Sequence, residues 1–160
     1  MIKLIALLLT FSVANAQSNF YVLPKDTSHF EHSLNSHLKN TREEIIILTP
    51  SLNYPSLKAK LIQSVSKGVN LTIITHNPAY DPLALIAYEN VELLLHSEKS
   101  LNDTTIIMDT AFMCHHQGAL DAEQLSDNNE KIVCHEDALA IAKIRKAIIL
   151  LRSHSKRYLE

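Results

Sequence analysis

The chain has 160 residues, among which 15 Lys and Arg stand against 17 Asp and Glu, for a formal net charge of −2 at pH 7. Such a near-neutral balance excludes a broad electrostatic attraction to nucleic acid or anionic lipid, and charge alone names no partner. The length fits a single domain with a buried core, once a removable N-terminal segment is set aside.

The first 16 residues have the organisation of a secretory signal peptide. Lys3 supplies a positive charge, residues 4–13 form a mostly apolar run, and residues 14–16 (Ala-Asn-Ala) form a small-x-small cleavage sequence. A membrane span needs about 20 apolar residues, so the run is too short for an anchor. We therefore expect cleavage after Ala16, a mature domain at residues 17–160, and a periplasmic or secreted location.

Short β-branched runs alternate with longer stretches that are apolar at helical spacing, which predicts one domain built as a β-α-β-α-β series. In chain order the predicted elements are a strand at 20–23, a helix from 28, a strand at 44–49, a helix at 55–68, a strand at 70–75, a weak helix at 82–88, strands at 91–95, 104–108, 111–114 and 131–134, and a long helix from 137. Only Asp109 and Thr110 separate the 104–108 and 111–114 strands, which indicates a tight antiparallel hairpin.

Local signals set the expected ends of these elements. Residues 28–31 (Ser-His-Phe-Glu) read as a capping box at the start of the first helix, and Pro50 is expected to end the 44–49 strand. Pro55 should open the second helix, and Gly68 lies where a helix C-cap needs a left-handed residue. Asp137 is expected to cap the last helix.

The last predicted helix is apolar on one side and basic on the other. Its apolar residues are Ile141, Ile144, Ile148 and Leu151. Its basic residues are Lys143, Arg145, Lys146 and Arg152. The pattern indicates a helix that packs on the sheet and presents a solvated basic face, with positive charge favoured near its C-terminus by the helix dipole.

Cysteine occurs at two positions, Cys114 and Cys134. In the oxidising compartment that the signal peptide implies, a pair of this kind favours a disulfide over free thiols. We therefore expect a bridge between them.

The order of the elements resembles that of the phospholipase D superfamily, from Phe20 to Tyr158. The most similar branch is that of short exported bacterial nucleases with one catalytic motif per chain. The local resemblance lies in residues 128–133 (Asn-Asn-Glu-Lys-Ile-Val), which are similar to the asparagine-glutamate segment that follows the catalytic motif. The resemblance implies a single α/β domain with a mixed sheet flanked by helices, in which the strands that carry Cys114 and Cys134 are neighbours.

Active members of that superfamily carry H-x-K-x4-D and then G-S/T-x-N. One imidazole attacks phosphorus, a second from a partner motif protonates the leaving group, and lysines hold the phosphate oxygens. Aligned on Asp109, this chain has Asn102 in place of the histidine and Thr104 in place of the lysine, and residues 116–119 read His-Gln-Gly-Ala. Asp109 and Glu130 are the family-like residues that remain. Asparagine is no phosphorus nucleophile and threonine carries no positive charge, so we expect the family mechanism not to run.

Two alternatives stay open at this point. In the first, His96 or His116 is the nucleophile of a rearranged site and Lys99 holds the phosphate, although His96 and Lys99 are three residues apart and alternate residues share a strand face. In the second, Cys114, His116, Cys134 and His135 bind a transition metal, although strand alternation brings at most three of these groups together easily. We assign no metal ligands and no cofactor.

The sequence thus predicts an exported phospholipase D-like domain that has lost phosphodiesterase catalysis and acts as a binding or assembly module. A phosphorylated ligand, a nucleic-acid strand or another envelope protein are the partners that fit, and no membrane span is expected after cleavage. Superfamily members with one motif pair two chains, so the resemblance also implies a homodimer. The alternatives are an active phosphodiesterase or nuclease and a small metal-binding envelope protein.

Overall fold

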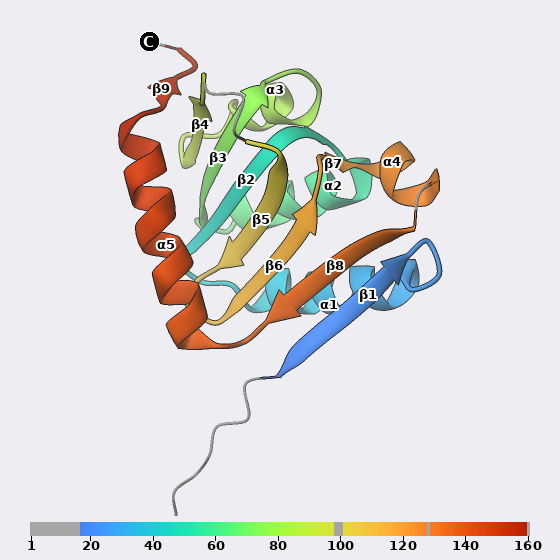
Figure 1. The fold of residues 1–160 in the computed structure, drawn as a ribbon. Coiled ribbons are helices and arrows are strands. Elements are labelled where there is room, and N and C mark those ends of the chain that lie inside the picture. The colour runs from blue at the N-terminus through green and yellow to red at the C-terminus, as the bar shows by residue number, and fades with distance from the viewer. Residues whose placement is uncertain (1–16, 98–100, 128, 160) are drawn as a thin grey trace, which may run out of the picture.

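A computed structural model describes residues 17–97, 101–127 and 129–159 (Figure 1). The predicted signal peptide, Lys99 and Asn128 lie outside these residues. The described chain forms one mixed sheet with helices on both faces. Within this part of the chain, no helix has both the length and the apolar character needed to cross a bilayer.

The elements follow the predicted alternation. They are β1 (Ser18–Leu23), α1 (Thr27–Asn40), β2 (Glu44–Asn53), α2 (Pro55–Val65), β3 (Asn70–Asn77), α3 (Asp81–Leu85), β4 (Val91–Leu95), β5 (Asp103–Met108), β6 (Phe112–Gln117), β7 (Leu120–Asp121), α4 (Ala122–Asp127), β8 (Glu130–His135), α5 (Ala138–Ser153) and β9 (Lys156–Arg157). The short elements β7, α4 and β9 were not predicted.

The sheet has the strand order β1-β8-β6-β5-β2-β3-β4-β9, and β7 pairs with the end of β2. β2, β3 and β4 are parallel, whereas β5, β6, β8 and β1 each pair antiparallel with their neighbours. The carboxyl ends of β2, β3, β4 and β6 therefore lie at the same edge as the amino ends of β5 and β8. We call this the polar edge, after its residues Thr49, Thr75, Thr104, His116 and Glu130.

Alternate residues of the central strands enter two cores. Ile45 and Ile47 of β2 are fully buried in the larger core, to which α1 and α2 contribute (Figure 1). Ile46 lies in the smaller core with Ile141 and Ile148 of α5. Because successive side chains of a strand point to opposite faces, a strand covered on both sides is apolar at consecutive positions, as residues 45–48 of β2 are.

Two predicted helix ends are confirmed. Gly68 adopts φ 92° after α2, which is the left-handed conformation that glycine enters without steric cost. The Asp137 carboxylate accepts hydrogen bonds from the backbone N–H groups of Leu139 and Ala140 at the start of α5.

The predicted capping box at residues 28–31 is wrong. α1 begins at Thr27, so Ser28 lies inside the helix and no side chain caps the N-terminus. Asp26 precedes the helix, and its carboxylate accepts a hydrogen bond from the backbone N–H of Val22 instead. The acidic side chain thus holds the turn between β1 and α1.

Pro50 does not end β2, and that prediction is also wrong. The strand continues to Asn53 because Leu52 and Asn53 pair with β7. Pro50 has no backbone N–H to donate within the strand. Its carbonyl oxygen accepts a hydrogen bond from the Thr75 hydroxyl at 2.9 Å. The β5–β6 hairpin is confirmed, with one residue more in the loop, since Met108 pairs with Phe112.

Candidate functional site

Asn102 and Thr104 lie where the resemblance places a catalytic histidine and lysine, at the amino end of β5. Asn102 is exposed, and its carbonyl oxygen accepts a hydrogen bond from the N–H of Gly118 at 3.0 Å. Thr104 is only 1% exposed and points into the larger core side of the sheet beside β6. The two side chains therefore lie in different environments, one in solvent and one buried.

The Thr104 hydroxyl belongs to a buried chain of hydrogen bonds. The N–H of Leu120 donates to Oγ1 of Thr49 at 3.2 Å, and that oxygen lies 2.7 Å from Oγ1 of Thr104. The Thr104 hydroxyl in turn donates to the carbonyl oxygen of Gly118 at 2.7 Å. This chain fixes the turn between β6 and β7, where Gly118 has φ 103°. Thr104 thus supports the backbone at the position where the resemblance implies a phosphate-binding lysine.

Replacing Thr104 with valine is expected to lower the free energy of unfolding by about 1.5 kcal/mol, because valine keeps the shape but leaves buried polar partners unpaired. Urea denaturation of the purified variant measures this. Thr72→Val in β3 is the control, because no hydrogen bond of the Thr72 hydroxyl is found within the described residues, and we expect little change from it. Equal losses in the two variants would contradict the assigned role of Thr104.

His116 and Glu130 are brought together at the polar edge. His116 is 4% exposed, and its Nδ1 lies 3.9 Å from a carboxylate oxygen of Glu130. Within the described residues this Nδ1 has no hydrogen-bond partner. His116 is also the direct neighbour of Thr104 across β5 and β6. An imidazole paired with a carboxylate is the arrangement of a general base, so this pair is the strongest chemical candidate in the described chain.

His96 does not join that pair. It follows β4 and is buried, with its Nδ1 3.2 Å from the Ser155 hydroxyl after α5, and its carbonyl oxygen lies 2.7 Å from Nδ1 of His76. In the sheet order, β4 and β6 are four strand spacings apart, which is about 19 Å. His96 and His116 therefore belong to separate environments, and the position of Lys99 lies outside the described residues.

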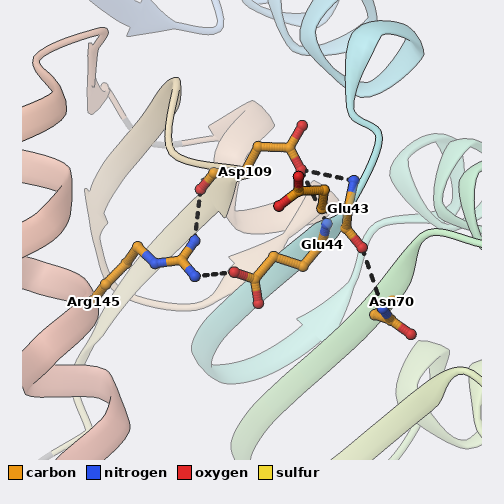
Figure 2. Close-up of polar contacts among 5 residues, drawn as sticks. All are labelled: Glu43, Glu44, Asn70, Asp109 and Arg145. Atoms are coloured by element: carbon orange, nitrogen blue, oxygen red, sulfur yellow. Dashed lines mark hydrogen bonds and ion pairs between the residues drawn. The ribbon is translucent and has the colours of Figure 1, made fainter.

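Asp109 lies at the opposite edge of the sheet, in the hairpin after β5 (Figure 2). Its carboxylate accepts hydrogen bonds from the backbone N–H groups of Arg42, Glu43 and Glu44, each at 3.0 Å. Arg145 of α5 donates to the Asp109 carbonyl oxygen at 2.8 Å and forms an ion pair with Glu44. Asp109 therefore joins the hairpin, the start of β2 and α5, and it lies far from Thr104.

The pKa of Asp109 is set by opposing effects. Burial raises it, but the three backbone N–H donors and the nearby Arg145 guanidinium lower it by more, so that the pKa lies below its usual value. A carboxylate that is held ionised in this way is a structural anion. It is not suited to giving up or taking a proton near neutral pH.

Cys114 and Cys134 form a disulfide between the paired strands β6 and β8. Both residues are buried in the larger core. The bridge contradicts the alternative metal site, since bonded sulfur atoms offer no thiolate ligands. His135 is also unsuited to it, because it points to the other sheet face and its Nδ1 lies 2.8 Å from the Ser18 hydroxyl.

A groove crosses β1, β8 and β6 next to the polar edge. Its lining residues are Phe20, His115, Gln117, Asn129, Glu130, Lys131 and Val133. Phe20 is 57% exposed, and Lys131 is exposed as well. The groove thus combines an open aromatic ring, two amide side chains, an imidazole, an ammonium group and the Glu130 carboxylate. We call it the Phe20 groove.

Comparisons with known proteins give a match at the level of structure. Neither family models nor curated proteins match the sequence. NucT from Helicobacter pylori has a TM-score of 0.80 at 18% identity, over 89% of this chain and 99% of that one. Nuc from Salmonella typhimurium, a phospholipase D family member, has a TM-score of 0.76 at 15% identity, over 89% and 98%. This chain has the phospholipase D fold.

A third similar structure shares only part of its length. TrmBL2, an archaeal chromatin protein, has a TM-score of 0.66 at 15% identity, over 88% of this chain and 52% of that one. Together these structures confirm the phospholipase D fold that the order of elements predicted, as a single α/β domain with a mixed sheet between helices.

Sequence reasoning named the polar residues of this phospholipase D fold but missed how they are paired. Thr49 was not singled out, although its hydroxyl bonds Thr104. The sequence spacing of His116 and Glu130 does not indicate that they lie together. The usable signal was that both lie at the ends of adjacent strands, β6 and β8, which the resemblance implied to be neighbours.

Proposed function

We propose that this chain is an exported phospholipase D-fold protein that binds a ligand at the polar edge and does not hydrolyse phosphodiesters. The observation that carries the proposal is the environment of Thr104. A catalytic lysine would need to present a positive charge there, and the chain instead has a buried hydroxyl that is hydrogen-bonded to Thr49 and to the Gly118 carbonyl. No imidazole lies two residues before Thr104, where the resemblance implies the catalytic histidine, since Asn102 occupies that position.

The Phe20 groove supports the binding part of the proposal. Lys131 can pair with a phosphate oxygen, the amides of Gln117 and Asn129 can form hydrogen bonds, and the ring of Phe20 can stack on a planar group. A phosphorylated ligand or a nucleic-acid strand fits this chemistry better than a purely apolar ligand does. The archaeal chromatin protein TrmBL2 has a mode of DNA binding that its structure shows, which is consistent with a nucleic-acid ligand here.

Export is the other part of the proposal. The signal-peptide pattern of residues 1–16 and the disulfide between Cys114 and Cys134 both fit an oxidising compartment. Sequencing the N-terminus of protein purified from the expressing cells tests it. We expect the mature chain to begin at Gln17, and an intact Met1 in the cytoplasmic fraction would contradict export.

An active phosphodiesterase is the second candidate, and the His116–Glu130 pair favours it. In that case the His116 imidazole, oriented by Glu130, would attack phosphorus next to Thr104. A positive group to hold the phosphate oxygens would then have to come from Lys99, from Lys131 or from a second copy of the chain.

Turnover assays separate the two candidates. Purified residues 17–160 are incubated with bis-p-nitrophenyl phosphate, single- and double-stranded DNA and RNA, with and without chelator. We expect no hydrolysis above the buffer rate, together with binding of labelled single-stranded DNA or phosphate that Lys131→Ala weakens. Hydrolysis that is abolished by His116→Ala and kept in His96→Ala would overturn the proposal in favour of the second candidate. Elution volume and light scattering in the same preparation report whether two chains pair.

A further inference from the structure

The closing helix α5 has a composition unlike that of the rest of the chain. Its sixteen residues include four basic residues and no acidic one, and most of the others are Ala, Ile or Leu. The net charge of the whole chain is −2, so the near-neutral total conceals a strongly cationic segment. Interaction with a charged surface depends on how charge is distributed over the molecule, and the net charge alone does not describe it.

The two arginines of α5 are neutralised by contacts with the sheet. Arg145 pairs with Glu44 and bonds the Asp109 carbonyl oxygen, and Arg152 pairs with Glu92. They lie on the side of the helix that carries the buried residue Ile148. Their charge therefore serves to attach α5 to the domain.

The outward side of α5 is different. Leu139, Lys143, Lys146 and Leu150 follow one another at spacings of four, three and four residues, which places them along one exposed ridge of the helix. Leu139 is 76% exposed and Leu150 is 64% exposed. Both lysines are exposed as well, and neither forms an ion pair within the described residues. We call these four residues the α5 ridge.

Further groups of the same two kinds adjoin the ridge. Ile149 is 63% exposed beside Leu150, and Lys156 and Leu159 follow the helix, with Leu159 80% exposed. In Figure 1, α5 runs along one side of the molecule, with the chain end near its final turn. A helix that is apolar on its inner side and also exposes large apolar residues on its outer side is expected to be covered.

We propose that the α5 ridge docks on the surface of an anionic phospholipid bilayer. Leucine and isoleucine side chains insert at the headgroup boundary, and lysines on the same ridge reach the phosphate level with their long side chains. The positive charge complements anionic headgroups, and each lysine near such a surface adds to binding. This docking does not depend on the ligand or the activity at the polar edge.

Charge favours this occupant over a second copy of the chain. A two-fold contact through α5 places the same patch of both chains face to face. Lys143 and Lys146 of one chain would then lie near those of the other, and the ridge has no acidic residue to pair with them. An anionic surface removes this repulsion and uses the same apolar residues.

Vesicle sedimentation tests the proposal. Residues 17–160 are mixed with vesicles of phosphatidylcholine, or of phosphatidylcholine with phosphatidylglycerol, and the bound fraction is measured at low and high salt. We expect binding to the anionic vesicles that falls with salt. Lys143→Glu/Lys146→Glu and Leu139→Gln/Leu150→Gln should each weaken partitioning by about tenfold. Lys39→Glu/Lys67→Glu changes two exposed lysines away from α5 by the same net charge and should stay within about twofold.

The controls show whether the α5 ridge binds anionic lipid. All substituted positions are exposed, and circular dichroism confirms that each variant is folded. Equal binding to both kinds of vesicle, or equal loss in the Lys39/Lys67 control, would overturn the proposal. So would a dimer in light scattering that Leu139→Gln/Leu150→Gln dissociates, because the ridge would then be a contact between copies. Hydrolysis and DNA binding are read separately, so failure here leaves the proposed function standing and failure there leaves the docking proposal standing.

Discussion

Replacing Asp109 with alanine is expected to lower the free energy of unfolding by about 3 kcal/mol. The carboxylate accepts three hydrogen bonds from the backbone N–H groups of residues 42–44, and alanine cannot replace any of them. Asp109 also has φ 51°, a left-handed conformation that aspartate adopts more readily than alanine does. Urea denaturation followed by circular dichroism measures the loss.

Asp109→Asn separates the charge of the side chain from its shape. Asparagine tolerates the left-handed conformation and can still accept hydrogen bonds, so we expect it to lose less stability than Asp109→Ala at neutral pH. The pKa of Asp109 is lower in the folded chain than in the unfolded one, since the three N–H groups and Arg145 outweigh the effect of burial. The ionised form therefore stabilises the fold above the unfolded pKa, which is about 4, and this contribution is lost as the pH falls through the lower folded value.

Stability measured from pH 7 down to pH 2 tests this sign. The wild type should lose stability through the acid range, and Asp109→Asn should show a shallower decline because the titrating group is gone. Glu89→Gln removes an exposed carboxyl group before β4 and should leave the wild-type slope unchanged. If the free energy of unfolding of Asp109→Asn fell with pH in parallel with that of the wild type, the ionised Asp109 carboxylate would not be the source of the acid dependence.

The second large effect is expected at the disulfide. Cys114→Ala/Cys134→Ala should lower the free energy of unfolding by about 3 kcal/mol, because the bridge joins residues 20 apart and restricts the unfolded chain. Both side chains are buried between β6 and β8, so loss of sulfur volume adds a smaller cost. Denaturation with and without reductant measures the loss. Reductant should destabilise the wild type by most of the difference from the double variant, because the reduced chain keeps its buried sulfur atoms, and it should leave the double variant unchanged.

Mass spectrometry gives an independent check on the bridge. Reduction and alkylation of the unfolded wild type should label both cysteines, whereas alkylation without reduction should label neither. Labelling of both thiols in the untreated mature protein would contradict the disulfide and would reopen the alternative with thiolate ligands.

The alternation of elements could be predicted because it depends on neighbouring residues. Residues 45–48 of β2 form a continuous apolar run and β3 is rich in β-branched residues, and Asp137 and Gly68 mark helix ends through contacts with residues close in sequence. Elements that depend on distant partners could not be predicted. β7 has two residues and exists because it pairs with the end of β2, and the same pairing carries that strand past Pro50.

The candidate site could be predicted in its residue types but not in its contacts. The absence of histidine and lysine at Asn102 and Thr104 is visible in the sequence. The hydrogen bond between Thr49 and Thr104 joins residues 55 apart, and it follows only from the order of strands in the sheet. His96 is the opposite case, because it is close to Thr104 in the sequence but distant in the fold. It follows β4, which is three strand spacings from β5 in the sheet.

The position of β1 determines when the domain can be completed. β1 stands at one end of the sheet order, and within the described residues its only partner strand is β8, with Ser18 opposite His135, 117 residues later. A chain that emerges amino end first must therefore keep its leading strand unpaired until almost all of it has been delivered. Contacts of such long range close slowly. If the chain is exported as we propose, this delay would keep the sheet incomplete until most of the polypeptide has crossed the membrane.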